Sequence, residues 1–228
     1  MLRIRNRFVN SLIFISIALF SCQSLATALK YRSFTELVLN ADAIMQGQVQ
    51  QISSRRLDNG TIVTFVTLTN LDLHRGDYAF AEFTLVSHGG EVNGLVQKIQ
   101  GAPQFKLAQN LILFLQGNGK RMVPISGWGQ GMFVVNENMV HDYQLNPVLG
   151  IVNDQIQVQR LTVPDVILIG APEPAETTPL LTPMTEAQFI ESISRVTVTK
   201  RTTQLESVHP ETYTLPRHNA TELKMSQQ

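Results

Sequence analysis

The stretch TIVTFVTLTNLDLH, residues 61–74, is rich in Val, Thr, Phe and Leu, which are common in β-strands. The stretch AIMQGQVQQISSR, residues 43–55, precedes it and alternates only roughly between apolar and polar residues. Asp58-Asn59-Gly60 lies between the two, and Asn-Gly supplies the positive φ that tight hairpins need. These residues predict an antiparallel hairpin near the start of a β-rich domain.

Further short strands are expected downstream, punctuated by Gly and Asn. The continuous apolar run at 110–116 suits a strand buried on both faces. The other expected strands are 79–88, 121–126, a hairpin over 131–143 that turns about Asn136 to Asn138, and an extended segment over 154–170. Short strands at this spacing are typical of a barrel or a sandwich. We therefore predict a mainly β fold, with a β-barrel domain over 29–145 and an extended β extension over 146–170.

Two helices are expected, one before the strands and one after them in the sequence. Ser33 and Glu36 fit a capping box, which predicts a short helix ending near Ala41. Thr185 and Gln188 predict a second helix over 185–198, whose apolar stripe would dock on the barrel. That stripe consists of Phe189, Ile193 and Val196.

The flanks of this second helix are expected to lack regular structure. Residues 171–184 are rich in proline and are interpreted as a linker. Residues 199–228 are polar and contain Pro210 and Pro216, which predicts a disordered tail.

The N-terminus has the pattern of a secretory signal peptide, residues 1–28. Arg3, Arg5 and Arg7 form a positive region, and the apolar run after them is shorter than the about 20 residues that a membrane-spanning helix needs. Ala26-Thr27-Ala28 fits a cleavage site, so we expect export to the periplasm or the medium and no transmembrane span in the mature chain. In an alternative interpretation, Leu19 to Cys22 resembles a lipobox, and lipidation of Cys22 would anchor the protein.

Charge and cysteine content narrow the possible partners. The 18 Lys and Arg residues include the three arginines of the signal peptide, so cleavage leaves 15 basic against 18 acidic residues, a net charge of −3. This balance gives no basic footprint for nucleic acid and no polybasic patch for anionic lipid. The mature chain would hold no Cys, and therefore neither a disulfide nor a thiol nucleophile.

No metal centre or cofactor is predicted. The histidines lack the His-Glu-x-x-His and His-x-His spacings of metal ligands. The alternative of a hydrolase rests on two of them: His88 lies next to a Gly pair and three residues before Glu91, and His141 is followed by Asp142, which could orient it as a base. No G-x-S-x-G elbow supplies a nucleophile, so we expect no catalytic site.

The candidate binding residues lie in two glycine-rich loops. Gly127 to Gly131 does not match the nucleotide-binding pattern G-x-G-x-x-G, and no helix is expected after it. Trp128, the one tryptophan, would be either a buried plug or an exposed contact residue. We place a groove beside the loops at 86–105 and 126–131, with binding residues Trp128, Gln130, His88 and Glu91.

The order of short motifs resembles a family of exported bacterial proteins of unknown function. The motifs are IMQGQV at 44–49, HRGD at 74–77, HGGEVNG at 88–94, QGAPQF at 100–105, LILFL at 111–115 and GWGQGMFVV at 127–135. Some members of this family resemble companions of matrixin-like metalloproteases. A more distant resemblance, to netrin-like and metalloproteinase-inhibitor modules, implies an OB-like antiparallel β-barrel.

The inhibitors among those modules clamp a zinc ion through an N-terminal Cys. This chain departs from that pattern, because cleavage would leave Leu29 at the terminus and lipidation would block the amine of Cys22. We therefore expect an exported, non-enzymatic β-barrel module that binds a protein or a cell-envelope component. The alternatives are an inhibitor or accessory protein of a secreted matrixin-like metalloprotease, and a hydrolase using His88 or His141.

Overall fold

The computed structural model describes residues 28–160, 167–170, 182–196 and 205–216. The signal peptide up to residue 27, with Cys22, and residues 171–181 of the predicted linker lie outside the described residues. Among the helices described, none has the length and apolar character required to traverse a bilayer.

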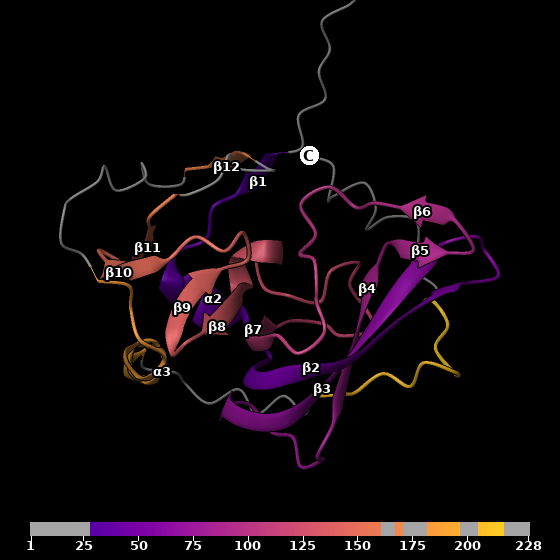
Figure 1. Ribbon diagram of the computed structural model, residues 1–228, viewed down its shortest axis with the longest axis horizontal. Helices are drawn as coiled ribbons and strands as arrows, with labels where there is room; N and C mark the ends of the chain where they lie inside the picture. The colour runs from indigo at the N-terminus through magenta and orange to yellow at the C-terminus, as the bar shows by residue number, and fades with distance from the viewer. Residues whose placement is uncertain (1–27, 161–166, 171–181, 197–204, 217–228) are drawn as a thin grey trace, which may run out of the picture.

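A six-stranded sheet with the order β4-β3-β2-β7-β8-β9 forms the body of the protein (Figure 1). Its strands are β2 (Ala43–Arg56), β3 (Ile62–Arg75), β4 (Phe83–His88), β7 (Asn110–Leu115), β8 (Met132–Asn136) and β9 (Met139–Asp142). Every neighbouring pair is antiparallel. The mainly β, antiparallel fold is confirmed, and the expected hairpins at 43–75 and 131–143 are present. Because no ladder between β4 and β9 is found in the described residues, the sheet is open there and the closed OB-like barrel stays a prediction.

Three two-stranded sheets and one short 3-10 helix lie outside the six-stranded sheet. They are the hairpin β5 (Gly90–Val92) with β6 (Leu95–Gln97), the hairpin β10 (Val148–Val152) with β11 (Gln155–Val158), the parallel pair β1 (Ala28–Lys30) with β12 (Ile167–Ile169), and the 3-10 helix η1 (Trp128–Gly131).

The β2–β3 hairpin is bent by three shifts in its register, after Ile44, Gln46 and Val49 (Figure 1). At the second shift, Asn70 adopts a positive φ of 52°, a conformation that asparagine tolerates better than most residues. Such bulges increase the local twist of a strand. The second half of β3 stays paired with β2, and β4 does not extend along it.

Helix α2 (Phe34–Asn40) forms where its capping box predicts it. The Ser33 side chain accepts a hydrogen bond from the backbone of Glu36, whose carboxylate accepts one from the Ser33 N–H in return. The helix buries Phe34, Leu37 and Val38, and it ends at Ala41, as expected.

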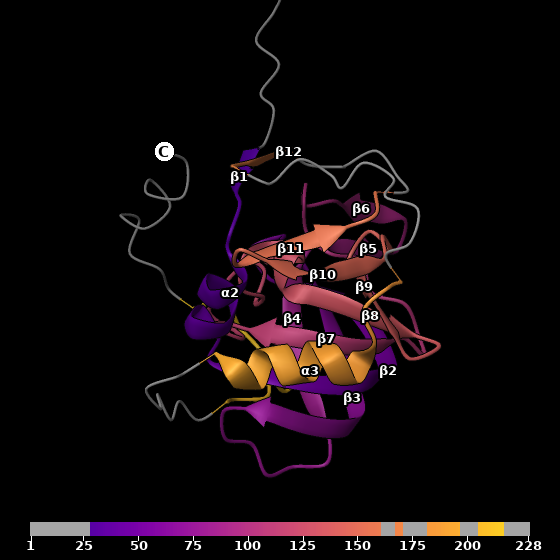
Figure 2. The same ribbon diagram turned by 90° about the vertical axis from the view of Figure 1, so that its left-hand side faces the viewer.

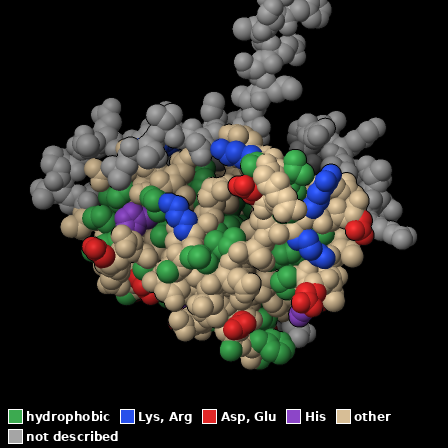
Figure 3. Space-filling view, turned by 45° about the vertical axis from the view of Figure 1, so that its right-hand side comes forward, with side chains coloured by type: hydrophobic (Ala, Val, Ile, Leu, Met, Phe, Trp, Pro, Cys, Tyr) green, Lys and Arg blue, Asp and Glu red, His purple; other side chains and the backbone are tan. Residues whose placement is uncertain are grey.

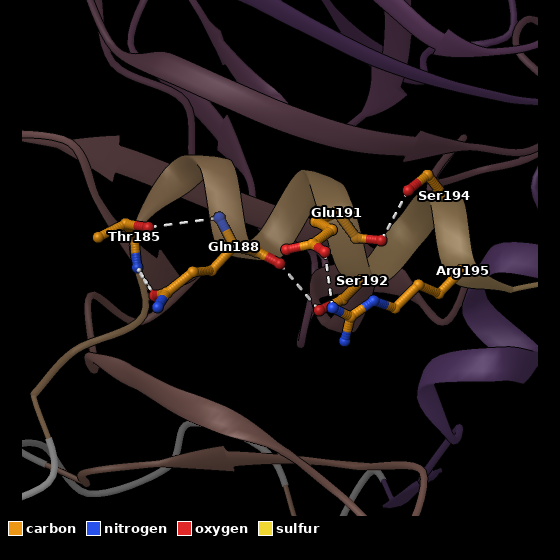
Figure 4. Close-up of polar contacts among 6 residues, drawn as sticks. All are labelled: Thr185, Gln188, Glu191, Ser192, Ser194 and Arg195. Carbon is orange, nitrogen blue, oxygen red and sulfur yellow. Dashed lines mark hydrogen bonds and ion pairs between the residues drawn. The ribbon is translucent and has the colours of Figure 1, made fainter.

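Helix α3 (Glu186–Arg195) lies across the sheet, as Figure 2 shows. Its first turn is closed by the capping box of Thr185 and Gln188 (Figure 4). Phe189 and Ile193 are buried, so the predicted stripe docks as expected. The ion pair on its outer face, Glu191 with Arg195, is exposed at both ends and adds little stability.

The two faces of the sheet are covered differently. Both helices pack on one face, together with Phe114 and Phe133. The other face carries Met45, Leu111 and Leu113 among its buried residues, and it is covered by loop residues and by Leu205.

Two expected strands need correction. The strand predicted over 79–88 begins at Phe83, because residues before it fold into a turn in which the Tyr78 hydroxyl donates to the carbonyl of Glu82. The strand predicted over 121–126 is reduced to one bridge, between Ile125 and Leu115. A continuous strand there is interrupted by Pro124, which has no N–H to donate to a ladder.

The tail predicted to be disordered over 199–228 is ordered where it is described, at 205–216. Leu205 is buried, and the Val208 N–H donates to the carbonyl of Thr84 in β4. The Tyr213 ring packs on Phe65 with 5.8 Å between ring centroids. The prediction was wrong here because the few apolar residues that contact the sheet are widely spaced among prolines and polar residues, so they form no recognisable pattern in the sequence.

The glycines of the stretch 86–105 serve as turns, as their spacing suggests. Gly90 has a φ of 131°, and a Cβ added there would lie 2.3 Å from the Thr64 hydroxyl oxygen. Only glycine fits this position, because it needs both the unusual φ and the close approach. The turn at Gly90 leads directly into the β5–β6 hairpin.

Candidate functional site

Trp128 is the first residue of η1 and is partly buried. Its side chain packs against the loop-covered core of the sheet, which Ala102 and Phe105 also contact. The predicted loops at 86–105 and 126–131 therefore cover the same core. Trp128 is neither a fully buried plug nor a fully exposed contact residue.

Gln130 uses its side chain to hold the N-terminal segment in place. Its amide nitrogen donates to the carbonyl of Lys30 at 3.0 Å, and its amide oxygen accepts from the Arg32 N–H at 2.9 Å. This pair of hydrogen bonds mimics a strand partner. Since both polar groups of Gln130 are engaged, the side chain serves the fold.

His88 and Glu91 lie elsewhere. His88 ends β4, is partly buried, and donates its backbone N–H to Met122, while Glu91 is exposed on β5. Strand β5 packs on β2 and β3, whereas η1 packs on β7 and β8. The four predicted binding residues are thus divided between two places and do not form one site.

His141 and Asp142 are successive residues of β9, so their side chains point to opposite faces. The Asp142 carboxylate accepts hydrogen bonds from the backbone of Gln144 and from both the backbone and the side chain of Asn146. Burial raises the pKa of Asp142, and these hydrogen bonds oppose that effect. The carboxylate organises the turn after β9 and does not orient His141.

Within the described ranges, no group of three or more His, Cys, Asp and Glu side chains is placed to hold a metal ion.

A free strand edge lies on the second half of β3. β4 pairs with β3 over Val63–Leu68, whereas the residues from Thr69 to Arg75 pair with β2 alone in the part of the chain that the structure describes. Backbone N–H and C=O groups on such an edge can accept a further strand.

A shallow hollow of about 360 Å³ lies beside this edge. It is lined by Thr69, Asn70, Leu71, Phe80, Ala81 and Glu82. At the lower end of the molecule, where Figure 1 shows the loop between β3 and β4, apolar and acidic side chains lie next to each other in Figure 3. We call the residues from Thr69 to Arg75 together with this hollow the β3 edge site.

Phe80 is the most exposed large apolar side chain described, with 71% of its surface accessible. Its ring contacts Tyr78 at 5.5 Å, and Tyr78 in turn rests on the buried Phe83 at 5.4 Å. These two ring contacts and the hydrogen bond from Tyr78 to Glu82 hold the loop between β3 and β4 against the sheet. Phe80 is therefore presented to solvent on an ordered support.

Sequence reasoning missed this site because it placed Phe80 inside a strand over 79–88. Alternation in AFAEF does not distinguish an exposed aromatic residue from a buried one.

A polar network joins β3, β2 and α3 next to the β3 edge site. A ring nitrogen of His74 hydrogen-bonds the side-chain oxygen of Gln46 at 3.2 Å, and the Gln46 amide donates to Glu186 at 2.8 Å. Burial lowers the pKa of His74, and the negative charges of Asp72 and Glu186 oppose this effect more weakly.

The lowered pKa of His74 predicts a pH-dependent stability. The unfolded chain takes up a proton near the ordinary value of 6.5, before the folded protein does, so stability is lost as the pH falls below that value. Solvent screening of this half-exposed group limits the loss to less than about 1 kcal/mol. Urea unfolding at pH 7.5 and pH 5.5 measures it, and His74→Gln, which keeps a side-chain donor, should show a smaller difference between the two pH values. If the stability of the wild type and of His74→Gln changed equally between the two pH values, His74 would not be the source of the pH dependence.

Comparisons with known proteins show no match for this chain among family models, curated sequences or solved structures.

Proposed function

We propose that this chain is an exported, non-enzymatic β module that binds a protein partner through the β3 edge site. The observation that carries the proposal is the combination of a strand edge with no further partner among the described residues and the exposed Phe80, whose ring rests on Tyr78. Aromatic side chains are enriched at the centres of protein interfaces. The proposal of export rests on the signal-peptide pattern of residues 1–28, and an OB-like barrel is the finer fold that we propose with it.

The protein-binding proposal is favoured over a zinc clamp by the position of the N-terminal segment. Leu29, which cleavage would make the first residue, pairs with Leu168 in the β1–β12 ladder. A clamp needs a terminal amine and carbonyl that are free to approach a metal. Inhibition of a metalloprotease is therefore the second candidate function. An inhibitor of this kind would have to bind the protease through a surface other than its N-terminus.

Substitution of Phe80 tests the proposal directly. Phe80→Ala should reduce the amount of partner retained from the periplasmic or culture fraction by about tenfold, since loss of an interface anchor commonly costs more than about 1 kcal/mol. Val152→Ala is the matched control, because Val152 is 54% exposed and lies on β10. Retention is measured by quantitative mass spectrometry of cross-linked complexes.

The same experiment contains the outcome against the proposal. Equal retention by the wild type and Phe80→Ala would exclude the β3 edge site as the binding surface. Loss of retention in Trp128→Ala, with Phe80→Ala unaffected, would return the site to the loops at 86–105 and 126–131.

A further inference from the structure

The β3 edge site has an acidic border. Asp72, Asp77 and Glu82 are all exposed around it. Arg75, at the end of the β3 edge site, is basic. Its guanidinium donates to the backbone carbonyl of Val38 in α2, which does not line the hollow. His74 is likewise engaged with Gln46. The charges left at the border are therefore negative.

The shape of the site favours an extended ligand. Among the described residues, Thr69 to Arg75 pair with β2 alone, and the extended part after the bulge at Asn70, Leu71 to Arg75, has the length of a short strand. Side chains of an added strand would alternate between the two faces. On β3 itself, Leu71 and Leu73 contact the loop-covered core, while Asp72 between them is exposed. A partner strand would thus meet an apolar row on one face and a carboxylate on the other.

We propose that the partner contributes an extended segment in which apolar residues alternate with Lys or Arg, and that this segment joins the free edge of β3 as an added strand. Backbone hydrogen bonds supply affinity, the apolar side chains contact Leu71 and Phe80, and the basic side chains face Asp72 on the opposite side. Glu82, at the rim of the hollow, adds to the negative charge that attracts them. Charges at the border of an interface act mainly on partner choice and on the association rate. This inference rests on the proposed function and names the chemistry of the partner.

Synthetic peptides provide the probe. A seven-residue peptide of alternating Lys and Val, matching the length from Thr69 to Arg75, should bind the purified chain in fluorescence anisotropy at low salt. The affinity should fall as salt is added, because exposed charges beyond about 10 Å are screened at 0.1 M. The alternating Glu and Val peptide should bind at least about tenfold more weakly, in line with the cost of like charges. The Lys and Val peptide with N-methyl groups on alternate amides should not bind, because it cannot form the ladder.

Charge reversal on the protein distinguishes the border from non-specific attraction. The double variant Asp72→Lys with Glu82→Lys should lower the affinity for the Lys and Val peptide by about tenfold or more, and it should raise the affinity for the Glu and Val peptide. Asp58→Lys with Glu137→Lys changes the net charge equally at exposed positions on the β2–β3 turn and on the β8–β9 turn, and it should leave both affinities unchanged.

The outcomes separate this inference from the proposed function. If Phe80→Ala abolishes partner capture but no Lys and Val peptide binds, the β3 edge site still binds a partner and the basic-strand inference is wrong. Equal binding of the N-methylated peptide would also overturn it. If neither capture nor peptide binding depends on Phe80, both proposals fail.

Discussion

Phe189→Ala is expected to lower the free energy of unfolding by about 3–5 kcal/mol, the range for removing a large buried aromatic side chain. Phe189 has no accessible surface and packs on Phe133 with 4.6 Å between ring centroids. Its ring also meets Phe34 at 5.8 Å and Phe114 at 6.3 Å. One side chain of α3 thus joins α2, β7 and β8 into a single aromatic cluster.

The cavity left by Phe189→Ala cannot close easily, because its aromatic walls belong to three different elements, α2, β7 and β8. Urea unfolding followed by tryptophan fluorescence measures the loss, since the midpoint falls while the slope with denaturant stays constant. Phe80→Ala removes the same atoms from an exposed position and serves as the control, with an expected change within about 0.5 kcal/mol. A loss below about 1 kcal/mol for Phe189→Ala would mean that α3 does not pack on the sheet as described.

This cluster also shows what could be predicted from the sequence. The capping boxes at Ser33 and Thr185 and the stripe on α3 are local patterns, and each determines one element and its buried side. The β2–β3 hairpin is equally local, because β-forming residues lie on both sides of Asn59-Gly60. Such features depend on residues that are close in the sequence.

The features that the sequence did not reveal depend on distant residues. The bulge at Asn70 and the early end of the β3–β4 pairing become visible only when the strands are aligned. Gln130 was expected to bind a partner, yet its amide is occupied by Lys30 and Arg32, about one hundred residues earlier. The polarity of a side chain indicates that it will form hydrogen bonds and leaves the identity of the partner open.

The ordering of residues 205–216 is the clearest case of such a long-range effect, and it centres on Asn118. This side chain lies in the turn after β7 with 8% of its surface accessible. Its oxygen accepts from the Val86 N–H at 3.0 Å, and its nitrogen donates to the carbonyls of Thr84 and Glu206, each at 2.9 Å. One amide therefore connects the edge strand β4 to the C-terminal segment.

Asn118→Ala is expected to destabilise the protein by about 2–3 kcal/mol, because it leaves the buried Val86 N–H of β4 without its partner and removes the hydrogen bonds to Thr84 and Glu206. The loss should not be uniform. Hydrogen exchange should accelerate first at the amides of Leu205 and Val208, whose own bonds to Asp77 and Thr84 hold the same segment on the sheet. The amides of β7 should remain protected, since their ladders with β2 and β8 do not involve Asn118.

Asn136→Ala is the matched control for Asn118→Ala, because Asn136 is exposed at the end of β8 and should cost less than about 0.5 kcal/mol. Uniform acceleration of exchange across β4, β7 and the C-terminal segment would show that Asn118 stabilises only the whole fold. Unchanged protection at Leu205 and Val208 would show that apolar contacts of Leu205 and Tyr213 suffice. Selective loss at 205–216 is the result expected if the buried Asn118 amide holds the segment that covers β4, in addition to the Ser207 hydroxyl, which accepts from the Thr84 N–H.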